Sequence, residues 1–203
     1  MSALRRLLGG FFLFLYRLRE RARGKLFSLL GGGAFAAFGA RSVLQPPVRL
    51  KGEGRIAIGD DVYVGAGSWL HVVSGNGRGV AISIGDGTSI AGACVLSAAR
   101  SISVGKKVLM ARNVYVSDHS HAFESIGPPV VDQGIARVAP VEIGDGAWLG
   151  QNVFVGPGVC IGAGAVIGAN AVVLHNVPAH SVAVGVPAAV TRSLLGEAAP
   201  LAG

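Results

Sequence analysis

A six-residue unit repeats six times without interruption over residues 143–178. The first position of each unit is a branched aliphatic residue, the fifth is small or β-branched, and the fourth is Gly or Asn. Gly and Asn tolerate the left-handed backbone of a tight turn better than other residues do. An uninterrupted hexapeptide period is the sequence signature of a parallel β-helix, and it therefore predicts the architecture of the chain.

The same register continues toward the N-terminus, with interruptions, in units led by aliphatic residues: Ile58, Val64, Leu70, Ile84, Ile90, Leu96, Ile102, Val104, Met110 and Val116. Three units are expected to close one triangular coil, with the leading aliphatic side chains pointing inward. A single coil cannot bury its own apolar face, so the coils must stack. We predict an all-β fold with a parallel β-helix over residues 46–192, a helical appendage over 1–45 and a flexible tail over 193–203.

The two cysteines, Cys94 and Cys160, occupy repeat positions where small apolar side chains are expected. Free cysteine is among the most buried residue types and packs as a small hydrophobe. We therefore predict two buried thiols, and neither a disulfide framework nor a cysteine-based zinc site.

The net charge of +7 is concentrated at one end of the chain. Residues 1–25 hold seven of the eighteen basic residues and one of the eleven acidic residues, so the repeat region is close to neutral. Nucleic-acid-binding domains spread basic residues over a folded face, together with aromatic or groove-reading elements. The sequence lacks that pattern, and we do not expect a nucleic-acid partner.

The basic N-terminus surrounds an apolar run of ten residues, 7–16. A helix needs about 20 apolar residues to cross the hydrocarbon core of a bilayer, so this run is too short to span it. On a helix, one face would gather apolar side chains flanked by arginines: Leu4, Leu7, Leu8, Phe11, Leu15 and Leu18. Such helices lie in the membrane interface and are attracted to anionic lipid, so residues 1–25 are a predicted membrane-surface element.

Two other interpretations of the N-terminal segment stay open. A secretory signal needs a small-residue cleavage site after its apolar run, whereas an arginine-rich stretch follows this one. Alternatively, the helix packs on the β-helix or on a neighbouring subunit. A second uncharged stretch, residues 26–40, contains three consecutive glycines and is compatible with either membrane contact or packing.

One polar insertion interrupts the repeat, at residues 117–140. It begins with four titratable side chains close together: Asp118, His119, His121 and Glu124. Long loops on a rigid scaffold are where catalytic residues collect, so we predict that the chemistry resides in this loop. His71 and His180 have no polar cluster around them in the sequence, and we predict that they are structural or solvated.

The hexapeptide array, the DHSH loop, the GAWLG segment and the terminal GVPAAV together resemble the left-handed β-helix acetyltransferases. This hexapeptide-repeat family includes the galactoside, maltose and bacterial-polysaccharide O-acetyltransferases, and the resemblance is closest to the polysaccharide branch. It covers about residues 50–192. It implies a left-handed coil, a homotrimer with active sites in the grooves between neighbouring β-helices, and acetyl-CoA as the acyl donor along the C-terminal coils.

Within this resemblance, His119 matches the catalytic histidine of the family. Imidazole titrates near neutral pH and can take the proton of a sugar hydroxyl while the oxygen attacks a thioester carbonyl. A preorganised donor would hold the resulting oxyanion. Because no Ser or Cys nucleophile is required, we expect direct transfer in a ternary complex. Four further residues are expected to bind the acceptor or to support the catalytic ring: Asp118, His121, Glu124 and Trp148.

The resemblance also suggests five contacts to the acyl donor: Gly150, Ala163, Gly168, His175 and Arg192. The last coil reads VVLHNVP where the family often has VVTKDVP, so Leu174 and His175 replace a Thr and a Lys. In the closing segment Ala189 replaces one of two basic residues, which leaves Arg192 for the cofactor phosphates. No metal is expected.

The expected acceptor is a sugar hydroxyl of a bacterial cell-surface polysaccharide or of a lipid-linked glycan precursor. In the galactoside branch an Asn positions the acceptor hydroxyl, whereas Ala93 stands at the corresponding point here, which argues against a free galactoside. The basic and apolar N-terminus suits a lipid-tethered acceptor. We therefore expect a cytoplasmic protein that is peripheral at the inner face of the bacterial cytoplasmic membrane. Soluble acceptors stay open: serine, a free sugar or a sugar nucleotide.

Two further functions are compatible with a β-helix. A γ-type carbonic anhydrase places three histidines around zinc, conventionally with a five-residue spacing in one pair. His119 and His121 are two residues apart, and the sequence offers no obvious third partner. A non-catalytic interaction scaffold would need no polar loop.

Overall fold

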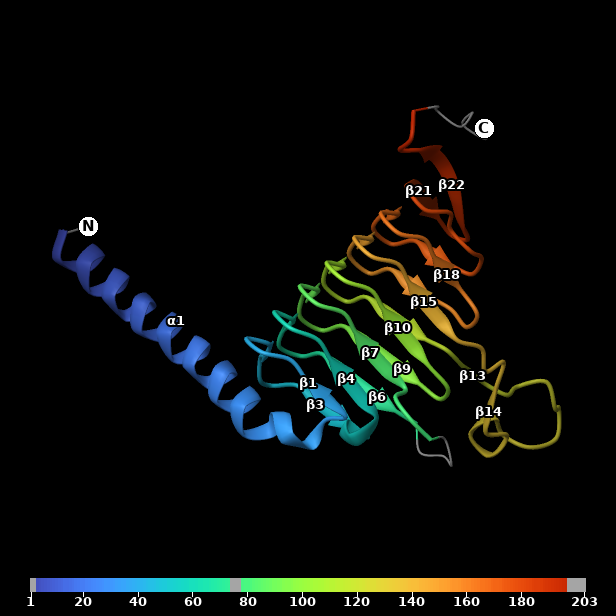
Figure 1. The fold of residues 1–203 in the computed structure, drawn as a ribbon, viewed down its shortest axis with the longest axis horizontal. Coiled ribbons are helices and arrows are strands. Elements are labelled where there is room, and N and C mark those ends of the chain that lie inside the picture. The colour runs from blue at the N-terminus through green and yellow to red at the C-terminus, as the bar shows by residue number, and fades with distance from the viewer. Residues whose placement is uncertain (1–2, 74–77, 197–203) are drawn as a thin grey trace.

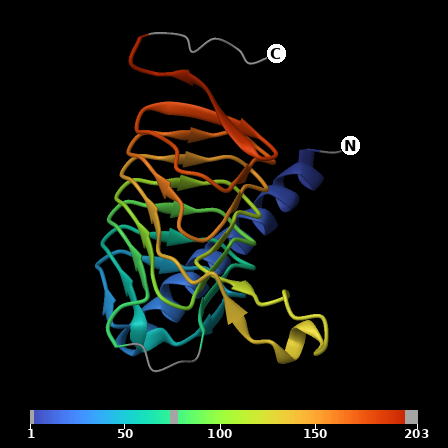
Figure 2. The ribbon, with the colours of Figure 1, turned by 90° about the vertical axis from the view of Figure 1, so that its right-hand side faces the viewer.

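The structure, a computed structural model, describes residues 3–73 and 78–196. A long helix, α1 (Ala3–Gly31), leads through a 3₁₀ turn, η1 (Gly32–Ala34), into a stack of triangular coils (Figure 1). The helix and the stack form a V that is joined at the first coil, and a hairpin loop projects from the side of the stack (Figures 1 and 2).

Each coil contributes short strands to three parallel sheets, here called A, B and C. Sheet A has six strands: β1 (Ala37–Phe38), β4 (Ile56–Ile58), β7 (Ile82–Ile84), β10 (Ile102–Val104), β15 (Val141–Ile143) and β18 (Cys160–Ile161). Sheet B has eight: β2 (Val43–Leu44), β5 (Tyr63–Val64), β8 (Ser89–Ile90), β11 (Leu109–Met110), β16 (Trp148–Leu149), β19 (Val166–Ile167), β21 (Ser181–Gly185) and β22 (Ala188–Ser193). Sheet C has six: β3 (Arg49–Lys51), β6 (Trp69–Val72), β9 (Val95–Ala98), β12 (Tyr115–Ser117), β17 (Phe154–Val155) and β20 (Val172–Val173).

The chain passes from sheet A to B to C in every coil, so the prism has an A–B, a B–C and a C–A corner. Two elements depart from this plan. The insertion after β12 contains an antiparallel hairpin, β13 (Ser120–His121) with β14 (Ile135–Ala136), and the 3₁₀ turn η3 (Val130–Asp132). At the end of sheet B, β22 folds back antiparallel on β21. The remaining 3₁₀ turn, η2 (Glu53–Arg55), precedes β4.

The aliphatic residues that lead the hexapeptide units form the core, as predicted. Their side chains are at most 2% exposed over the uninterrupted array: Ile143, Leu149, Val155, Ile161, Ile167 and Val173. The small fifth positions are also buried, from Ala147 to Val177. The prism is therefore an apolar column that is continuous from coil to coil, and the predicted parallel β-helix with an N-terminal helix is confirmed.

The Asn residues at the fourth position form a ladder on the B–C corner. Asn113, Asn152 and Asn170 adopt left-handed backbone angles, with φ of 62°, 60° and 62°. The side-chain amide of Asn113 donates to Asn152 at 3.1 Å, and that of Asn152 donates to Asn170 at 2.9 Å. Asn176 has a different role, because its side-chain oxygen accepts the Cys160 N–H at 2.8 Å. These amides add side-chain hydrogen bonds between turns of neighbouring coils that backbone hydrogen bonds also join.

The first coil begins at Ala37, inside the segment that the sequence assigned to the helical appendage. Ala37 pairs with Ala57 and Phe38 with Ile58, so these residues already follow the register of the next coil. The boundary predicted at residue 46 lies within this coil, because a Pro–Pro pair at its B–C corner obscures the repeat. At the other end β22 runs to Ser193, and residues 197–203 of the predicted tail lie outside the described residues.

Cys160 corrects the prediction of two buried thiols. Cys94 is buried, but Cys160 is exposed on the outer face of sheet A. Cys160 occupies the sixth position of the unit VGPGVC, directly before the inward-pointing Ile161. Because successive side chains of a strand point to opposite faces, Cys160 points outward.

Helix α1 contacts the first coil through its C-terminal part. The Ser28 hydroxyl accepts the Leu44 N–H at 2.8 Å, and the Gln45 side-chain amide donates to the Glu20 carbonyl at 3.1 Å. Side chains from Leu4 to Arg19 are all exposed. Among the described residues, α1 included, there is no helix with the length and apolarity that a membrane crossing requires.

Replacing Leu149 by Ala should lower the free energy of unfolding by about 2–5 kcal/mol, because it removes buried apolar atoms and leaves a cavity in the core. Leu149 is fully buried, whereas Leu109 in the neighbouring strand of sheet B is 49% exposed and provides a matched control. Denaturant titration followed by circular dichroism measures both variants. Equal losses for Leu149→Ala and Leu109→Ala would contradict the inward assignment.

Candidate active site

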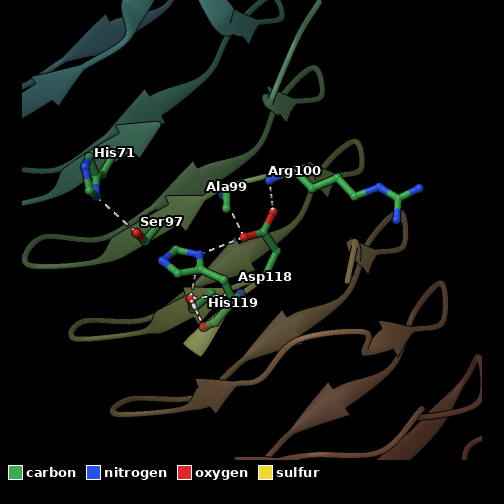
Figure 3. A network of polar contacts seen from close by, with 7 residues as sticks. His71, Ser97, Ala99, Arg100, Asp118 and His119 are labelled. Carbon is green, nitrogen blue, oxygen red and sulfur yellow. Dashed lines mark hydrogen bonds and ion pairs between the residues drawn. The ribbon is translucent and has the colours of Figure 1, made fainter. Parts of the chain in front are cut away.

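Asp118 and His119 form a hydrogen-bonded pair where the chain leaves β12. The Asp118 Oδ1 atom lies 2.8 Å from His119 Nδ1, and the Asp118 side chain is fully buried while that of His119 is 11% exposed. The carboxylate also accepts two backbone N–H groups of the preceding coil, from Ala99 at 2.7 Å and Arg100 at 2.6 Å (Figure 3). The two backbone N–H groups therefore fix the carboxylate, and the carboxylate in turn orients the His119 imidazole.

Ser117 braces the backbone of the same turn. Its hydroxyl donates to the His119 carbonyl at 2.7 Å and lies 3.3 Å from the His119 N–H. The Asp118 carbonyl accepts the Ala139 N–H at 2.9 Å, so the end of the insertion is bonded back to its start. The chain thus leaves and rejoins the prism next to the Asp118–His119 pair, and these hydrogen bonds hold the turn that carries the pair.

The geometry decides which imidazole nitrogen is available for chemistry. A carboxylate is acceptor-only when ionised, so Nδ1 carries the proton in the contact with Asp118. In the neutral ring Nε2 then has a free lone pair, and this second nitrogen acts as acceptor or base. If Nε2 takes a proton, the neighbouring carboxylate stabilises the imidazolium. The pair therefore has the parts of a general base.

His71 belongs to the same network, although the sequence suggested no polar cluster around it. Its Nδ1 lies 3.1 Å from the Ser97 hydroxyl (Figure 3). Its ring stacks on Trp69, with the ring centroids 4.6 Å apart. Burial lowers the pKa of His71, and the charge of Lys51 and the nearby His119 lower it further. The sequence held a usable signal, because His71, Ser97 and Ser117 each follow the leading aliphatic residue of a unit and pair in register.

His121 and Glu124 lie in the projecting hairpin. His121 is exposed in β13, and Glu124 forms an exposed ion pair with Arg137 at 3.2 Å. The Arg137 guanidinium also lies 5.4 Å from the centre of the Phe123 ring. These side chains line a hollow of about 240 Å³ in the hairpin. Within one chain only Asp118 makes a hydrogen bond to His119 among the four predicted acceptor or support residues.

Trp148 lies on another side of the prism. It is half-exposed on the outer face of sheet B, between Leu109 and Val166 of the adjacent strands. His119 follows sheet C at the C–A corner, so a single chain does not bring the two side chains together.

The five residues suggested for the acyl donor are spread over several corners. His175 shares the C–A corner with His119, Ala163 lies at the A–B corner, and Arg192 is exposed on β22. Gly150 and Gly168 lie at the B–C corner, where their N–H groups donate to the carbonyls of Ile167 and Ala183 at 2.8 and 2.9 Å. Those two N–H groups are engaged in the sheet and do not face a groove.

Comparison with known proteins identifies the family. A family model described as bacterial transferase hexapeptide (six repeats) matches residues 140–175. The chain is 31% identical over 156 residues to the putative lipopolysaccharide biosynthesis O-acetyl transferase WbbJ of Escherichia coli, covering 74% of this chain and 78% of that protein. It belongs to the bacterial hexapeptide-repeat transferase family. A probable acetyltransferase of Mycobacterium tuberculosis is 36% identical over 130 residues, which is 63% of this chain but only 43% of that relative.

Solved structures of two acyltransferases share the fold. An N-acyltransferase from Bacillus cereus, AntD, in complex with dTDP and coenzyme A, superimposes with a TM-score of 0.70 at 20% identity, covering 82% of this chain and 88% of the other. A hexapeptide-repeat acetyltransferase of Vibrio cholerae O1 biovar eltor, complexed with acetyl-CoA, gives a TM-score of 0.58 at 25% identity, covering 83% and 76%. The hexapeptide-repeat relatives imply a left-handed coil.

Replacing Asp118 by Ala should lower the free energy of unfolding by about 1–3 kcal/mol for each backbone donor left unsatisfied. The donors are the N–H groups of Ala99 and Arg100, which face the buried carboxylate. Glu124→Ala is the control, because exposed ion pairs contribute about 0–1 kcal/mol. Denaturant titrations compare the two variants. Similar stability for both would contradict the role of the Asp118 carboxylate in satisfying the two backbone N–H groups.

Proposed function

We propose that this protein transfers the acetyl group of acetyl-CoA to a sugar hydroxyl of a bacterial surface-glycan precursor, with His119 as general base. The observation that carries the proposal is the buried pair of Asp118 and His119, held 2.8 Å apart and oriented by two backbone N–H groups. The 31% identity to WbbJ, and the fold shared with an acetyltransferase solved with acetyl-CoA, support the reaction class.

The pair performs the proton transfers of a direct acyl transfer. His119 Nε2 takes the proton of the acceptor hydroxyl while its oxygen bonds to the thioester carbonyl carbon. The Asp118 carboxylate stabilises the resulting imidazolium through Nδ1. When the carbon–sulfur bond breaks, Nε2 returns the proton to the leaving thiolate, so that free coenzyme A and an acetyl ester result. No side chain of the protein becomes acylated.

A homotrimer completes this proposal. In one chain His119 lies at the C–A corner, whereas Trp148, Ala163 and Arg192 lie on or beside sheet B. We infer that a left-handed coil and a trimeric assembly place the sheet B side of one β-helix against the His119 edge of its neighbour. His175, on the same corner as His119, would then border the groove that holds the acyl donor.

The competing functions make different demands on the structure. A soluble acceptor such as a sugar nucleotide would use the same base, and the AntD neighbour was solved with dTDP. A γ-type carbonic anhydrase requires a cluster of metal ligands. Over residues 3–73 and 78–196, no three His, Cys, Asp or Glu side chains gather in such a group. A scaffold would have no reason to orient a histidine through a buried carboxylate.

We further propose that α1 holds the protein at an anionic membrane surface, on the inner face of the cytoplasmic membrane. The apolar residues of its N-terminal half are not covered by the prism, as the exposed fractions of Leu7 (73%), Phe11 (60%) and Phe12 (69%) show. Arginines flank this run on both sides. Apolar burial and electrostatic attraction together are what interfacial helices use.

His119→Ala should lower acetyl transfer about 10²–10⁴-fold, because that is the usual contribution of a positioned general base. Mass spectrometry of envelope glycans from cells with and without the gene first identifies the glycan that loses its acetyl group. With that glycan as acceptor, transfer from acetyl-CoA is measured by the release of the coenzyme A thiol. His180→Ala, at the A–B corner, is the histidine control and should keep full turnover. Near-normal turnover of His119→Ala would overturn the proposed function.

Replacing Arg17, Arg19, Arg21 and Arg23 by Gln should weaken binding to anionic vesicles by about 1 kcal/mol per residue near the surface. Deletion of residues 1–25 should abolish the binding. Sedimentation with vesicles of anionic lipid, compared with neutral vesicles, measures both effects. Full sedimentation of the deleted protein would refute the membrane anchor.

A further inference from the structure

The outer face of sheet C carries a polar column that leads to the active site. Lys51, His71, Ser97 and Ser117 lie side by side on β3, β6, β9 and β12, paired in register. Lys51 is exposed and His71 is half-buried, whereas Ser97 and Ser117, next to the active site, are buried. Ser117 is followed directly by the Asp118–His119 pair. Neighbouring strands lie about 4.8 Å apart, so β3 is about 14 Å from the strand that ends at the general base.

The neighbouring column of sheet C contains Arg49 and Trp69, and Trp69 holds the imidazole of His71 in place by stacking. The His71 ring stacks on Trp69 at an interplanar angle of 19°, and the Arg49 guanidinium lies 5.9 Å from the centre of the Trp69 ring. The Ser97 hydroxyl holds Nδ1 at 3.1 Å. Because Nδ1 is engaged, Nε2 is the nitrogen of His71 that remains for another molecule.

The far end of these columns is positively charged. Arg49 and Lys51 are exposed in β3, and none of the ion pairs among the described residues includes either of them. Glu53, the nearest acidic residue along the chain, begins η2 and is partly buried. The Asp118 carboxylate at the other end is buried and occupied by three donors. The face therefore offers two cations and no compensating exposed carboxylate on its strands.

We propose that the outer face of sheet C binds the acceptor as a glycosyl phosphate or diphosphate. In this arrangement His71 Nε2 contacts a sugar hydroxyl, and Arg49 and Lys51 contact the phosphate oxygens. The inference rests on the proposed function, which places the acetylated hydroxyl at His119, and it adds the class of group that must lie at the other end of the acceptor.

The chemistry of the residues supports this assignment. Arginine presents a planar fork of donors that matches phosphate oxygens, and lysine adds a compact charge. A neutral imidazole donates or accepts one hydrogen bond with a hydroxyl, which suits a sugar better than a second phosphate contact. The span of three strand spacings is comparable with a monosaccharide joined to a diphosphate. An uncharged free sugar would leave Arg49 and Lys51 without a partner.

Inorganic pyrophosphate tests the anion site without knowledge of the sugar. Titration of the full chain, followed by the imidazole NMR signals of its histidines, should shift the His71 signals in a saturable way. Arg49→Met combined with Lys51→Met should weaken the affinity at least tenfold. Lys107→Met, an exposed cation at the A–B corner, is the matched control and should bind like the parent protein. Equal affinity in the double variant, or saturable binding that leaves His71 unchanged, would overturn the proposal.

Failure of this inference is distinguishable from failure of the proposed function. His119→Ala should lose acetyl transfer and keep pyrophosphate binding, whereas the Arg49 and Lys51 variant should keep the rate at saturating acceptor and show a raised KM for it. The KM for acetyl-CoA should stay unchanged in that variant, and a rise confined to acetyl-CoA would contradict an acceptor site.

Two competitors separate the sources of the diphosphate. Uridine diphosphate represents a soluble sugar nucleotide, and farnesyl diphosphate represents a lipid carrier. Whichever inhibits transfer more strongly in competition with the acceptor identifies the source. Lack of competition by both, in protein that binds its acceptor normally, would overturn the glycosyl phosphate assignment.

Discussion

The structure depends on one constraint: no coil of this chain can bury its aliphatic residues alone. From β1 to β20 each strand of the coils is two to four residues long and pairs with strands of the neighbouring coils. The inward residues, such as Leu149 and Ile167, are covered only because the next coil repeats the same pattern. A slip of one residue would turn the aliphatic side chains outward, so the hydrophobic core fixes the register of every pair.

That fixed register turns sequence positions into columns on the surface. Each outward side chain has defined neighbours one coil away, which is how His71, Ser97 and Ser117 come to lie in line although 26 and 20 residues separate them. Insertions are tolerated only at a corner, where the chain can leave and return without breaking the backbone ladder. The long loop uses the C–A corner after β12, and the carbonyl of Asp118 and the N–H of Ala139 close its base. The prism thus fixes the two ends of a long loop at one defined corner.

The sequence predicts inward positions well because they obey one strong rule, and it predicts neighbours across coils poorly because they depend on coil length. The leading aliphatic residues and the polar insertion follow directly from the hexapeptide pattern. The sequence does not reveal the Ser97 partner of His71 because coil lengths differ before and after His71, so this partner is found only by aligning unit leaders rather than by counting residues. Cys160 was misjudged because its position faces outward in every unit. The two N–H groups that orient Asp118 carry no side-chain signal at all, since any residue in place of Ala99 or Arg100 could donate them.

The order of the coils connects the proposed membrane element with the proposed acceptor face. Helix α1 is bonded to the first coil through Ser28 and Leu44, and the same coil carries Arg49 and Lys51 in β3. His119 follows three strands later in sheet C. In the proposed arrangement, with α1 in the membrane interface, the cationic end of the face is the end joined to α1, and the proposed general base, His119, lies farther along the prism. A lipid-linked glycan has the same polarity, because its diphosphate lies next to the lipid and its sugars extend away from it. A soluble sugar nucleotide imposes no such order, so the arrangement of these coils favours the lipid-linked acceptor.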